Sequence, residues 1–312
     1  MPSRRRFVAA LTGCVGVAPG TGVDASGIRV RSGGTRVILL GTGGGPTPKR
    51  LRSAPAQAVI VGDRTYMVDC GDGVSRQLAM ARVPLPSIRA VLITHQHSDH
   101  NADYGNLLMF AWIAGLRAPI DTYGPPPLQK MTRLFLEMNA YDLEVRQRDE
   151  GRPPLSPSIR AHEIDKDGLV FDDGRVKVTA ALNRHPPVTP SFAYRFDTPD
   201  RSIVFSGDTN VSENVIRLAQ GADVLVHEVM HVPAIGPLLE GDPNATRLRE
   251  HLLASHTTTA DVGRVAAEAN VKTLVLSHFV PGNAELPDDD WAAGARKLFK
   301  GRIIVGTDLM EI

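Results

Sequence analysis

The sequence predicts an α/β or α+β sandwich, and two observations support this prediction. Short β-branched apolar runs alternate with helical patterns from Thr35 onward. Several strands come in pairs between the helices, which is typical of layered folds. The predicted strands are 36–40, 56–61, 64–69, 90–94, 176–181, 191–195, 202–206, 223–228, 273–278 and 302–306. The predicted helices are 73–82, 100–114, 126–139, 212–220, 258–269 and 288–299.

The composition is that of a soluble globular protein. Of 312 residues, 42% are hydrophobic and 22% are charged, which allows one domain, residues 29–312, to bury a sizeable core. The two cysteines, Cys14 and Cys70, exclude a disulfide framework, and Cys70 is expected to be a buried thiol. Aromatic residues make up 5% of the chain, which argues against an aromatic surface that stacks on bases or sugars.

The charge balance gives no sign of a broad nucleic-acid-binding surface. The chain has 35 basic and 34 acidic residues, and its net charge is +1. Arg4, Arg5 and Arg6 near the N-terminus account for this excess. Nucleic-acid-binding domains usually carry a clear basic excess. The balance leaves room for a local basic patch, but we do not expect a nucleic acid as the main partner.

The N-terminus has the pattern of an export signal. Basic residues 4–6 precede the apolar run 7–18, which is too short to anchor the mature protein in a membrane. Paired arginines before a phenylalanine resemble a twin-arginine signal, so we interpret residues 1–28 as signal and linker. The expected location is the periplasm, or the membrane surface if Cys14 is lipidated. Cleavage after Ala25 is the alternative to lipidation, and a basic tail on a cytoplasmic protein is the third interpretation. The sequence contains no transmembrane run. It is compatible with a homodimer.

Several apolar strands stop abruptly at histidine or aspartate. These strand ends are His95, Asp208, His227 with Glu228, and His278. Such ends place polar side chains at a sheet edge, where several of them make a site on rigid supports. The segment 95–100, His-Gln-His-Ser-Asp-His, holds four potential ligands in six residues, which is too many for one tetrahedral zinc ion. The segment therefore suggests two metal ions, each completed by ligands from elsewhere in the chain.

The His-x-His-x-Asp-His motif after a strand resembles the signature of the metallo-β-lactamase superfamily. Within it, the chain is most similar to ribonuclease Z and to the related arylsulfatases and phosphodiesterases. Further motifs follow in the expected order from about residue 36 to the C-terminus: Gly41-Thr42-Gly43, Asp69-Cys70-Gly71-Asp72-Gly73, His185, Ser206-Gly207-Asp208-Thr209, His227-Glu228, His256-Thr257-Thr258 and Ser277-His278-Phe279. The resemblance implies a four-layer αβ/βα sandwich with metals at one edge, between the sheets.

The resemblance also assigns metal ligands position by position. His95, His97 and His185 would hold one ion, Asp99, His100 and His278 would hold the other, and Asp208 would bridge both. The implied cofactor is two zinc ions per chain, with manganese or iron as alternatives. The implied nucleophile is a hydroxide held between the two ions, and Asp99 also belongs to the implied catalytic group.

Three further residues would lie around the metals. His256 would contact the oxyanion or the leaving group, Glu228 would orient His256, and Asp72 would orient a ligand histidine. Taken alone, His256 also fits a helix-capping residue, and Asp72 also fits a turn residue.

Two features narrow the implied substrate. A carboxylate at Asp208 favours phosphate or sulfate esters over β-lactams, because β-lactamases of this superfamily that use two metals typically offer cysteine or histidine to the second ion. Ribonuclease Z has a long arm between its third-motif histidine and its bridging aspartate, whereas His185 and Asp208 are only 23 residues apart. The sequence therefore predicts a hydrolase of small phosphodiester or sulfate esters. The alternatives are a ribonuclease Z-type tRNA endonuclease, a lactonase and, outside enzymes, a non-catalytic metal-binding protein.

Residues 227–231 spell the H-E-x-x-H motif of zinc peptidases, which works only on a helix. We interpret these residues as a strand end, because residues 223–226 have a strand pattern and Pro233 follows.

Residues 237–240 and 246–254 are predicted helical pieces that would wall a pocket for a small, partly apolar substrate.

Overall fold

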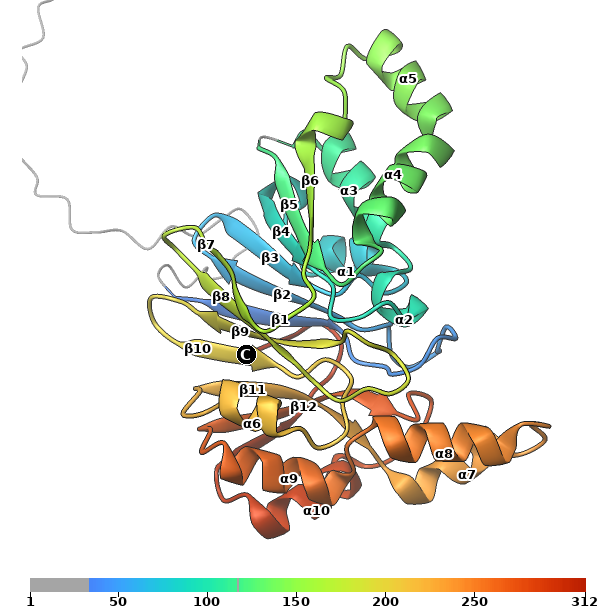
Figure 1. The fold of residues 1–312 in the computed structure, drawn as a ribbon, viewed down its shortest axis with the longest axis vertical. Helices are drawn as coiled ribbons and strands as arrows, with labels where there is room; N and C mark the ends of the chain where they lie inside the picture. The colour runs from blue at the N-terminus through green and yellow to red at the C-terminus, as the bar shows by residue number, and fades with distance from the viewer. Residues whose placement is uncertain (1–33, 117) are drawn as a thin grey trace, which may run out of the picture. The chain divides into compact units, whose positions relative to one another are not determined.

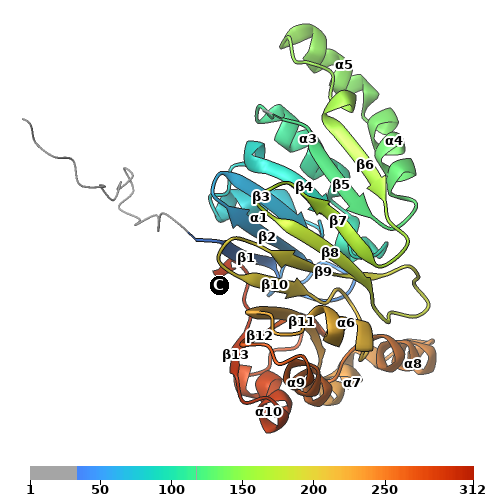
Figure 2. The same cartoon turned by 60° about the vertical axis from the view of Figure 1, so that its left-hand side comes forward.

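The computed structural model describes residues 34–116 and 118–312, which form two seven-stranded sheets packed face to face with helices on their outer faces (Figures 1 and 2). The first sheet has the order β14 (Met310–Glu311), β1 (Arg36–Gly41), β2 (Ala56–Val61), β3 (Arg64–Val68), β4 (Ile88–Leu92), β5 (Ile120–Gly124), β6 (Ile159–Glu163). The second has the order β13 (Arg302–Val305), β12 (Thr273–Val280), β11 (Val224–Met230), β10 (Ser202–Phe205), β9 (Phe192–Asp197), β8 (Lys177–Leu182), β7 (Gly168–Asp172). This arrangement confirms the predicted four-layer αβ/βα sandwich.

Each sheet changes from antiparallel to parallel pairing along its width. Strands β1 to β3 pair antiparallel, and β3 to β6 pair parallel. In the second sheet, β7 to β10 pair antiparallel and β10 to β13 pair parallel. Parallel strands bring their carboxyl ends to one edge of a sheet, which is where open α/β folds place their sites. The loops after β4 and β10 begin at such edges.

Helices cover the outer faces and connect the strands. The helices near the first sheet are α1 (Val74–Met80), α2 (Ser98–Asn101), α3 (Tyr104–Ile113), α4 (Leu128–Met138) and α5 (Ala140–Asp149). Those near the second are α6 (Glu213–Leu218), α7 (Gly236–Leu239), α8 (Ala245–Ser255), α9 (Thr259–Glu268) and α10 (Asp288–Leu298). None of the helices in the described ranges is long and apolar enough to cross a bilayer.

The hydrophobic core has three layers. The central layer joins the inner faces of the two sheets, with fully buried aromatic residues such as Tyr66, Tyr194 and Phe196. A second layer lies between the first sheet and helices α1 and α3, and it includes the buried thiol of Cys70. The third lies between the second sheet and helices α9 and α10, around Trp291. Apolar burial on both faces explains why most strands are almost continuously buried.

The structure departs from the sequence prediction in the segment after β4. Strands β5, β6 and β7 and helix α5 were not predicted. The predicted helix 100–114 is two helices, α2 and α3, separated around Asp103, whose carboxylate accepts a hydrogen bond from the Gly73 amide at 2.7 Å. Side chains in β6 and β7 are mostly half-buried or exposed, so these strands lack the run of apolar residues that marks a buried strand in the sequence. The predicted signal and linker, residues 1–28 with Cys14, lies outside the described residues.

The contact between α9 and α10 yields a prediction about stability. A Cβ atom at Gly263 would lie 2.5 Å from both the Cα and the O atom of Ala295, which are backbone atoms of α10. Gly263→Ala must therefore push the helices apart, and we expect it to lower the free energy of unfolding by about 1–3 kcal/mol. Gly236→Ala is the control, because a Cβ there meets nothing within 4 Å. Denaturant unfolding of both variants tests this, and equal stability of the two would contradict the packing argument.

Candidate metal centre

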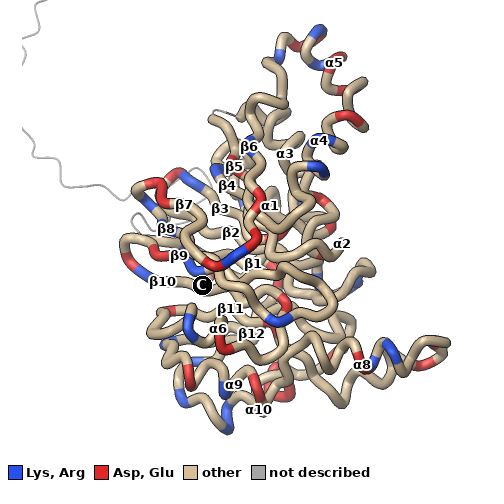
Figure 3. Tube along the Cα trace, viewed as in Figure 1, with Lys and Arg blue, Asp and Glu red and all other residues tan. Residues whose placement is uncertain are grey.

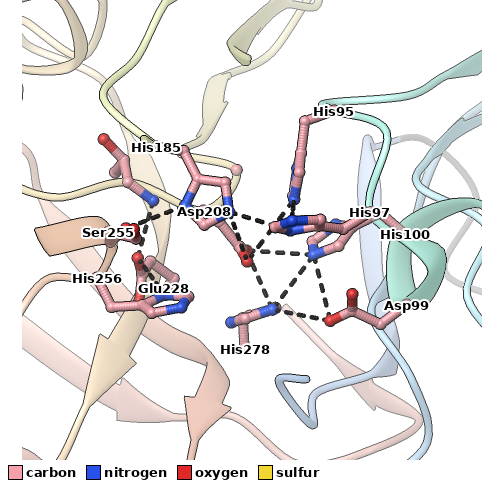
Figure 4. Close-up of polar contacts among 12 residues, drawn as sticks. His95, His97, Asp99, His100, His185, Asp208, Glu228, Ser255, His256 and His278 are labelled. Carbon is pink, nitrogen blue, oxygen red and sulfur yellow. Dashed lines mark hydrogen bonds and ion pairs between the residues drawn. The ribbon is translucent and has the colours of Figure 1, made fainter. Parts of the chain in front are cut away.

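Seven predicted ligands converge at the edge where the two sheets meet (Figure 4). The loop after β4 and helix α2 supply four of them, and the second sheet supplies the other three. The seven residues are His95, His97, Asp99, His100, His185, Asp208 and His278. All are buried except His97, which is half-buried. The structure thus brings together every predicted ligand, although residues 95 and 278 are far apart in the sequence.

The first ligand set comprises His95, His97, His185 and Asp208. Nδ1 of His97 lies 3.1 Å from Nε2 of His95 and 3.1 Å from Nε2 of His185. Nδ1 of His185 lies 3.1 Å from the Ser255 carbonyl, which can only accept, so this nitrogen carries the proton. Nε2 of neutral His185 therefore presents a lone pair to the shared centre, as a metal ligand must.

The second ligand set comprises Asp99, His100, His278 and again Asp208. Nδ1 of His100 donates to Asp69 Oδ2 at 2.8 Å, so a cation that displaces the proton on Nε2 would find the lone pair of that nitrogen facing the centre. That Nε2 lies 3.2 Å from Nε2 of His278 and 3.3 Å from Oδ1 of Asp208. Asp208 also lies 3.0 Å from His278, so its carboxylate is shared by the two sets.

The electrostatics of the two sets differ. Burial lowers the pKa of His95 and His97, and it lowers that of His185 to about 4, so these histidines are neutral. Burial also acts on His100, but the carboxylates of Asp208, Asp69 and Asp99 outweigh it and hold its pKa well above the usual value. Buried carboxylates therefore attract positive charge to the second set, which a cation can supply instead of protons.

The donors fit a pair of divalent ions. Imidazole nitrogens and carboxylate oxygens are the ligands that zinc takes, and in each set the four ligand atoms lie within 4.8 Å of one another. Ring nitrogens that face each other at 3.1 to 3.2 Å would be satisfied together by an ion at their centre. His95, His97 and His185 would hold one ion, Asp99, His100 and His278 the other, and Asp208 would contact both.

Asp69, rather than the predicted Asp72, orients a ligand histidine. Asp69 is buried, contacts His100 and also accepts from the Thr94 amide at 2.8 Å. Asp72 is exposed at the start of α1, because the chain turns outward over the intervening residues. Asp69 stands at the end of a predicted strand, as the predicted metal ligands His95 and Asp208 do. This position was the signal that could have identified its contact with His100.

This correction gives a matched pair of variants. Asp69→Asn removes the carboxylate that fixes the His100 tautomer, and we expect metal affinity to fall about 10- to 100-fold. Asp72→Asn makes the same chemical change on the exposed residue and should leave affinity unchanged. Metal titration with a competing chelator measures both. Equal affinities of the two variants would contradict the assignment.

His256 and Glu228 are in contact beside the second ligand set (Figure 4). Nδ1 of His256 lies 3.0 Å from Oε1 of Glu228, which also accepts from the Thr209 amide at 2.8 Å. Burial lowers the pKa of His256, but Glu228 and Asp208 outweigh burial and raise it above the usual value. The His256 ring stacks on the His278 ring, with 5.8 Å between their centroids. In the sequence, His256 directly follows the last residue of α8.

The H-E-x-x-H motif lies on a strand, as predicted. His227, Glu228 and the two residues after them belong to β11, so His227 and His231 do not share a helix face. Nδ1 of His227 is 2.7 Å from the Glu228 carbonyl, and the His231 ring packs on Trp291 at 5.6 Å. Neither histidine belongs to a ligand set found among the described residues.

A cleft of about 600 Å³ opens beside the centre. One wall is the loop 44–50, and the other comes from α7 and α8, which confirms that the segment between Glu228 and His256 walls a pocket. His97, Asp99, Asp208, His256 and His278 form part of its lining. His251 and Lys49 also line the cleft, and neither was among the predicted site residues. A lone histidine in a helix carries no motif that would have identified it.

The chain is similar in sequence to a known domain family and to proteins named ribonuclease Z. The profile of the Beta-lactamase superfamily domain matches residues 64–279. A ribonuclease Z of Mycobacterium bovis (strain BCG / Pasteur 1173P2) is 32% identical over 279 residues, covering 88% of this chain and 97% of that protein. A ribonuclease Z of Mycobacterium sp. (strain KMS) is 34% identical over 280 residues, covering 88% and 95%.

Solved structures share the architecture at lower sequence identity. The metallo-β-lactamase fold protein YhfI from Bacillus subtilis aligns with a TM-score of 0.64 and 21% identity, over 89% of this chain and 98% of its own. The short form of human tRNase Z has the same TM-score at 23% identity, with the same two coverages. Together with the converging ligand sets, the matched profile and the ribonuclease Z relatives establish that the chain belongs to the metallo-β-lactamase superfamily.

Proposed function

We propose that this chain is a binuclear metal-dependent phosphodiesterase. The observation that supports this most is the pair of ligand sets that share Asp208, with His256 and Glu228 beside them at the cleft. Two divalent ions bound there would supply Lewis acidity toward phosphoryl oxygens and make water a better nucleophile at neutral pH. Phosphodiesters fit better than sulfate esters, because the relatives are named ribonuclease Z, and RNA is a phosphodiester polymer.

The residues around the centre would handle the proton of the reaction. The new bond forms between water oxygen and phosphorus, and the bond from phosphorus to the departing ester oxygen breaks. The attacking water releases one proton to solvent, and His256 regains one from solvent after each turnover. His256 holds Nδ1–H against Glu228, and Glu228 and Asp208 raise its pKa, which favours the protonated ring. Nε2 of His256 then donates a proton to the departing oxygen, which leaves as an alcohol or phenol.

A ribonuclease Z-type endonuclease is the second candidate. It is favoured by relatives of that name, which are 32 to 34% identical and align over 95 to 97% of their own length. The short span from His185 to Asp208, occupied by β9, β10 and their connections, leaves no room for a long arm. Lys and Arg are interspersed with Asp and Glu along the described chain (Figure 3). These features make a small diester the first choice and tRNA the second.

A hydrolysis panel on metal-loaded protein tests the proposal. It should contain bis(4-nitrophenyl) phosphate, 4-nitrophenyl sulfate, a lactone, a β-lactam and a precursor tRNA. We expect hydrolysis of the aryl phosphodiester and about two metal ions per chain by elemental analysis. If the precursor tRNA is cleaved at its 3′ end with a higher kcat/KM than the aryl phosphodiester, the ribonuclease Z-type endonuclease becomes the better assignment. Turnover of the lactone or the sulfate alone would overturn both.

We also propose that the protein is exported in folded form, since residues 4–18 resemble a twin-arginine signal. Replacing Arg4 and Arg5 with lysine should retain the protein in the cytoplasmic fraction, whereas Arg29→Lys, outside the pattern, should not. Cell fractionation with an antibody measures this. An unchanged distribution in the paired variant would contradict export by that route.

A further inference from the structure

Helix α8 turns one face to the cleft, immediately next to the metal centre. Its residues Leu248, His251 and Leu252 line the cleft, and Leu238 of α7 lies beside them (Figure 1 shows α7 and α8 together at this edge). The face of α8 therefore combines apolar side chains with one imidazole. None of these residues belongs to a ligand set, so the function proposed above does not use them.

The apolar part of this wall is firmly supported yet still accessible. Leu252 is 7% exposed and packs with Met230, Ile235 and Val280, which fixes the position of the helix. Leu248 packs against the same cluster and is half-buried, and Leu238 is 39% exposed. These two side chains can lose more contact with water when a ligand covers them, and that loss favours binding of an apolar group.

The hydrogen bonds of His251 fix which of its ring nitrogens is available to a ligand. The hydroxyl of Ser255 donates its single hydrogen to the Pro186 carbonyl, so its oxygen can only accept from His251. Nδ1 of His251 lies 3.3 Å from that oxygen and therefore carries the proton of the neutral ring. Nε2 is then an acceptor, and no polar partner for it is found among the described residues. The ring lies near the centre, 6.2 Å from that of His185.

We propose that this face of α8 is a subsite for a planar, mostly apolar ring joined to the phosphorus of the ligand, through an ester oxygen in a substrate or directly in a phosphonate, and that Nε2 of His251 accepts a hydrogen bond from an O–H or N–H on that ring. The proposal rests on the proposed function only in placing a phosphorus oxyanion at the metal centre. A cleft of about 600 Å³ holds one such ring beside the phosphate. The subsite selects aryl-like ester groups over short alkyl groups.

Binding of phosphonates to the metal-loaded protein tests the subsite without any turnover. Calorimetry compares methylphosphonate, phenylphosphonate and the three hydroxyphenylphosphonate isomers. Phenylphosphonate should bind about tenfold tighter than methylphosphonate. Leu248→Asn and the more exposed Leu238→Asn should each lose most of this advantage while affinity for methylphosphonate stays the same. One hydroxyphenyl isomer should bind more tightly than phenylphosphonate, and His251→Phe should abolish that additional gain only.

Leu298→Asn is the control, because Leu298 is 52% exposed on α10 and does not line the cleft. It should keep the full preference for phenylphosphonate. The proposal is overturned if phenylphosphonate binds no tighter than methylphosphonate, if both leucine variants keep the preference, or if no isomer gains from its hydroxyl. Should the protein show the expected preferences but hydrolyse no diester, the subsite stands and the proposed function fails.

Discussion

Replacing His256 with alanine is expected to lower kcat about 10²- to 10³-fold, because the departing oxygen loses a fixed hydrogen-bond and proton donor. His256 belongs to neither of the two sets that share Asp208, so the variant should keep both metal ions. Steady-state assays with bis(4-nitrophenyl) phosphate measure kcat, and elemental analysis measures the metal content. His162→Ala is the control, because its side chain is 45% exposed and is paired with Asp121 at 2.9 Å, outside the cleft. A His256→Ala variant with full metal content and unchanged kcat would remove the proposed role.

Glu228 should act through His256, and a double-mutant cycle separates this from an independent effect. Glu228→Gln leaves the side chain the same size but weakens its hold on Nδ1 of His256. If Glu228 only positions and charges the imidazole, the double variant should be no slower than His256→Ala alone. Additive losses would show that Glu228 contributes by another route, such as its hydrogen bond from the Thr209 amide.

Removal of metal is expected to destabilise the fold strongly. With free metal at about 1,000 times its dissociation constant, binding contributes about 4 kcal/mol to the free energy of unfolding. For a domain of this size, that loss lowers Tm by about 8–16 °C. The reason lies in the ligand sets, which join the loop after β4 in one sheet to β12 and the loops after β8 and β10 in the other. Differential scanning calorimetry with and without a chelator measures the change.

Asp208→Asn provides the matched comparison for metal removal. The substitution keeps the shape of the side chain but removes the charge that both ligand sets share. We expect this variant to bind metal weakly, so chelation should change its Tm by much less than that of the original chain. A Tm that does not respond to chelation in the original protein would contradict a bridging metal centre.

Local patterns were sufficient to predict the elements that carry the site. The strand before His95 and the strand before Asp208 are short, apolar and almost fully buried, so their ends are sharp in the sequence. The ligand sets themselves could be assigned only by resemblance, because His100 and His278 meet across 178 positions. No periodicity in either segment specifies such a contact.

Where prediction failed, tertiary contacts decided the outcome. Asp69 and Asp72 stand three positions apart in one glycine-containing turn, and composition does not distinguish them. Asp69 takes a positive φ of 62°, which is compensated by its contacts with Thr94 and His100. Strand β6 lies at the edge of its sheet, and its residues are half-buried or exposed, so it lacks the continuous apolar run of the central strands.

The wide separation of the ligands along the chain has a consequence for the order of events in the cell. A full set of ligands exists only after both sheets have formed and met, and contacts this distant in sequence form late. Capture of metal must therefore complete folding rather than start it. If the chain crosses a membrane already folded, the ions available where it was synthesised are those that it carries. The compartment in which the protein matures, and not the one in which it works, would then decide which metal it uses.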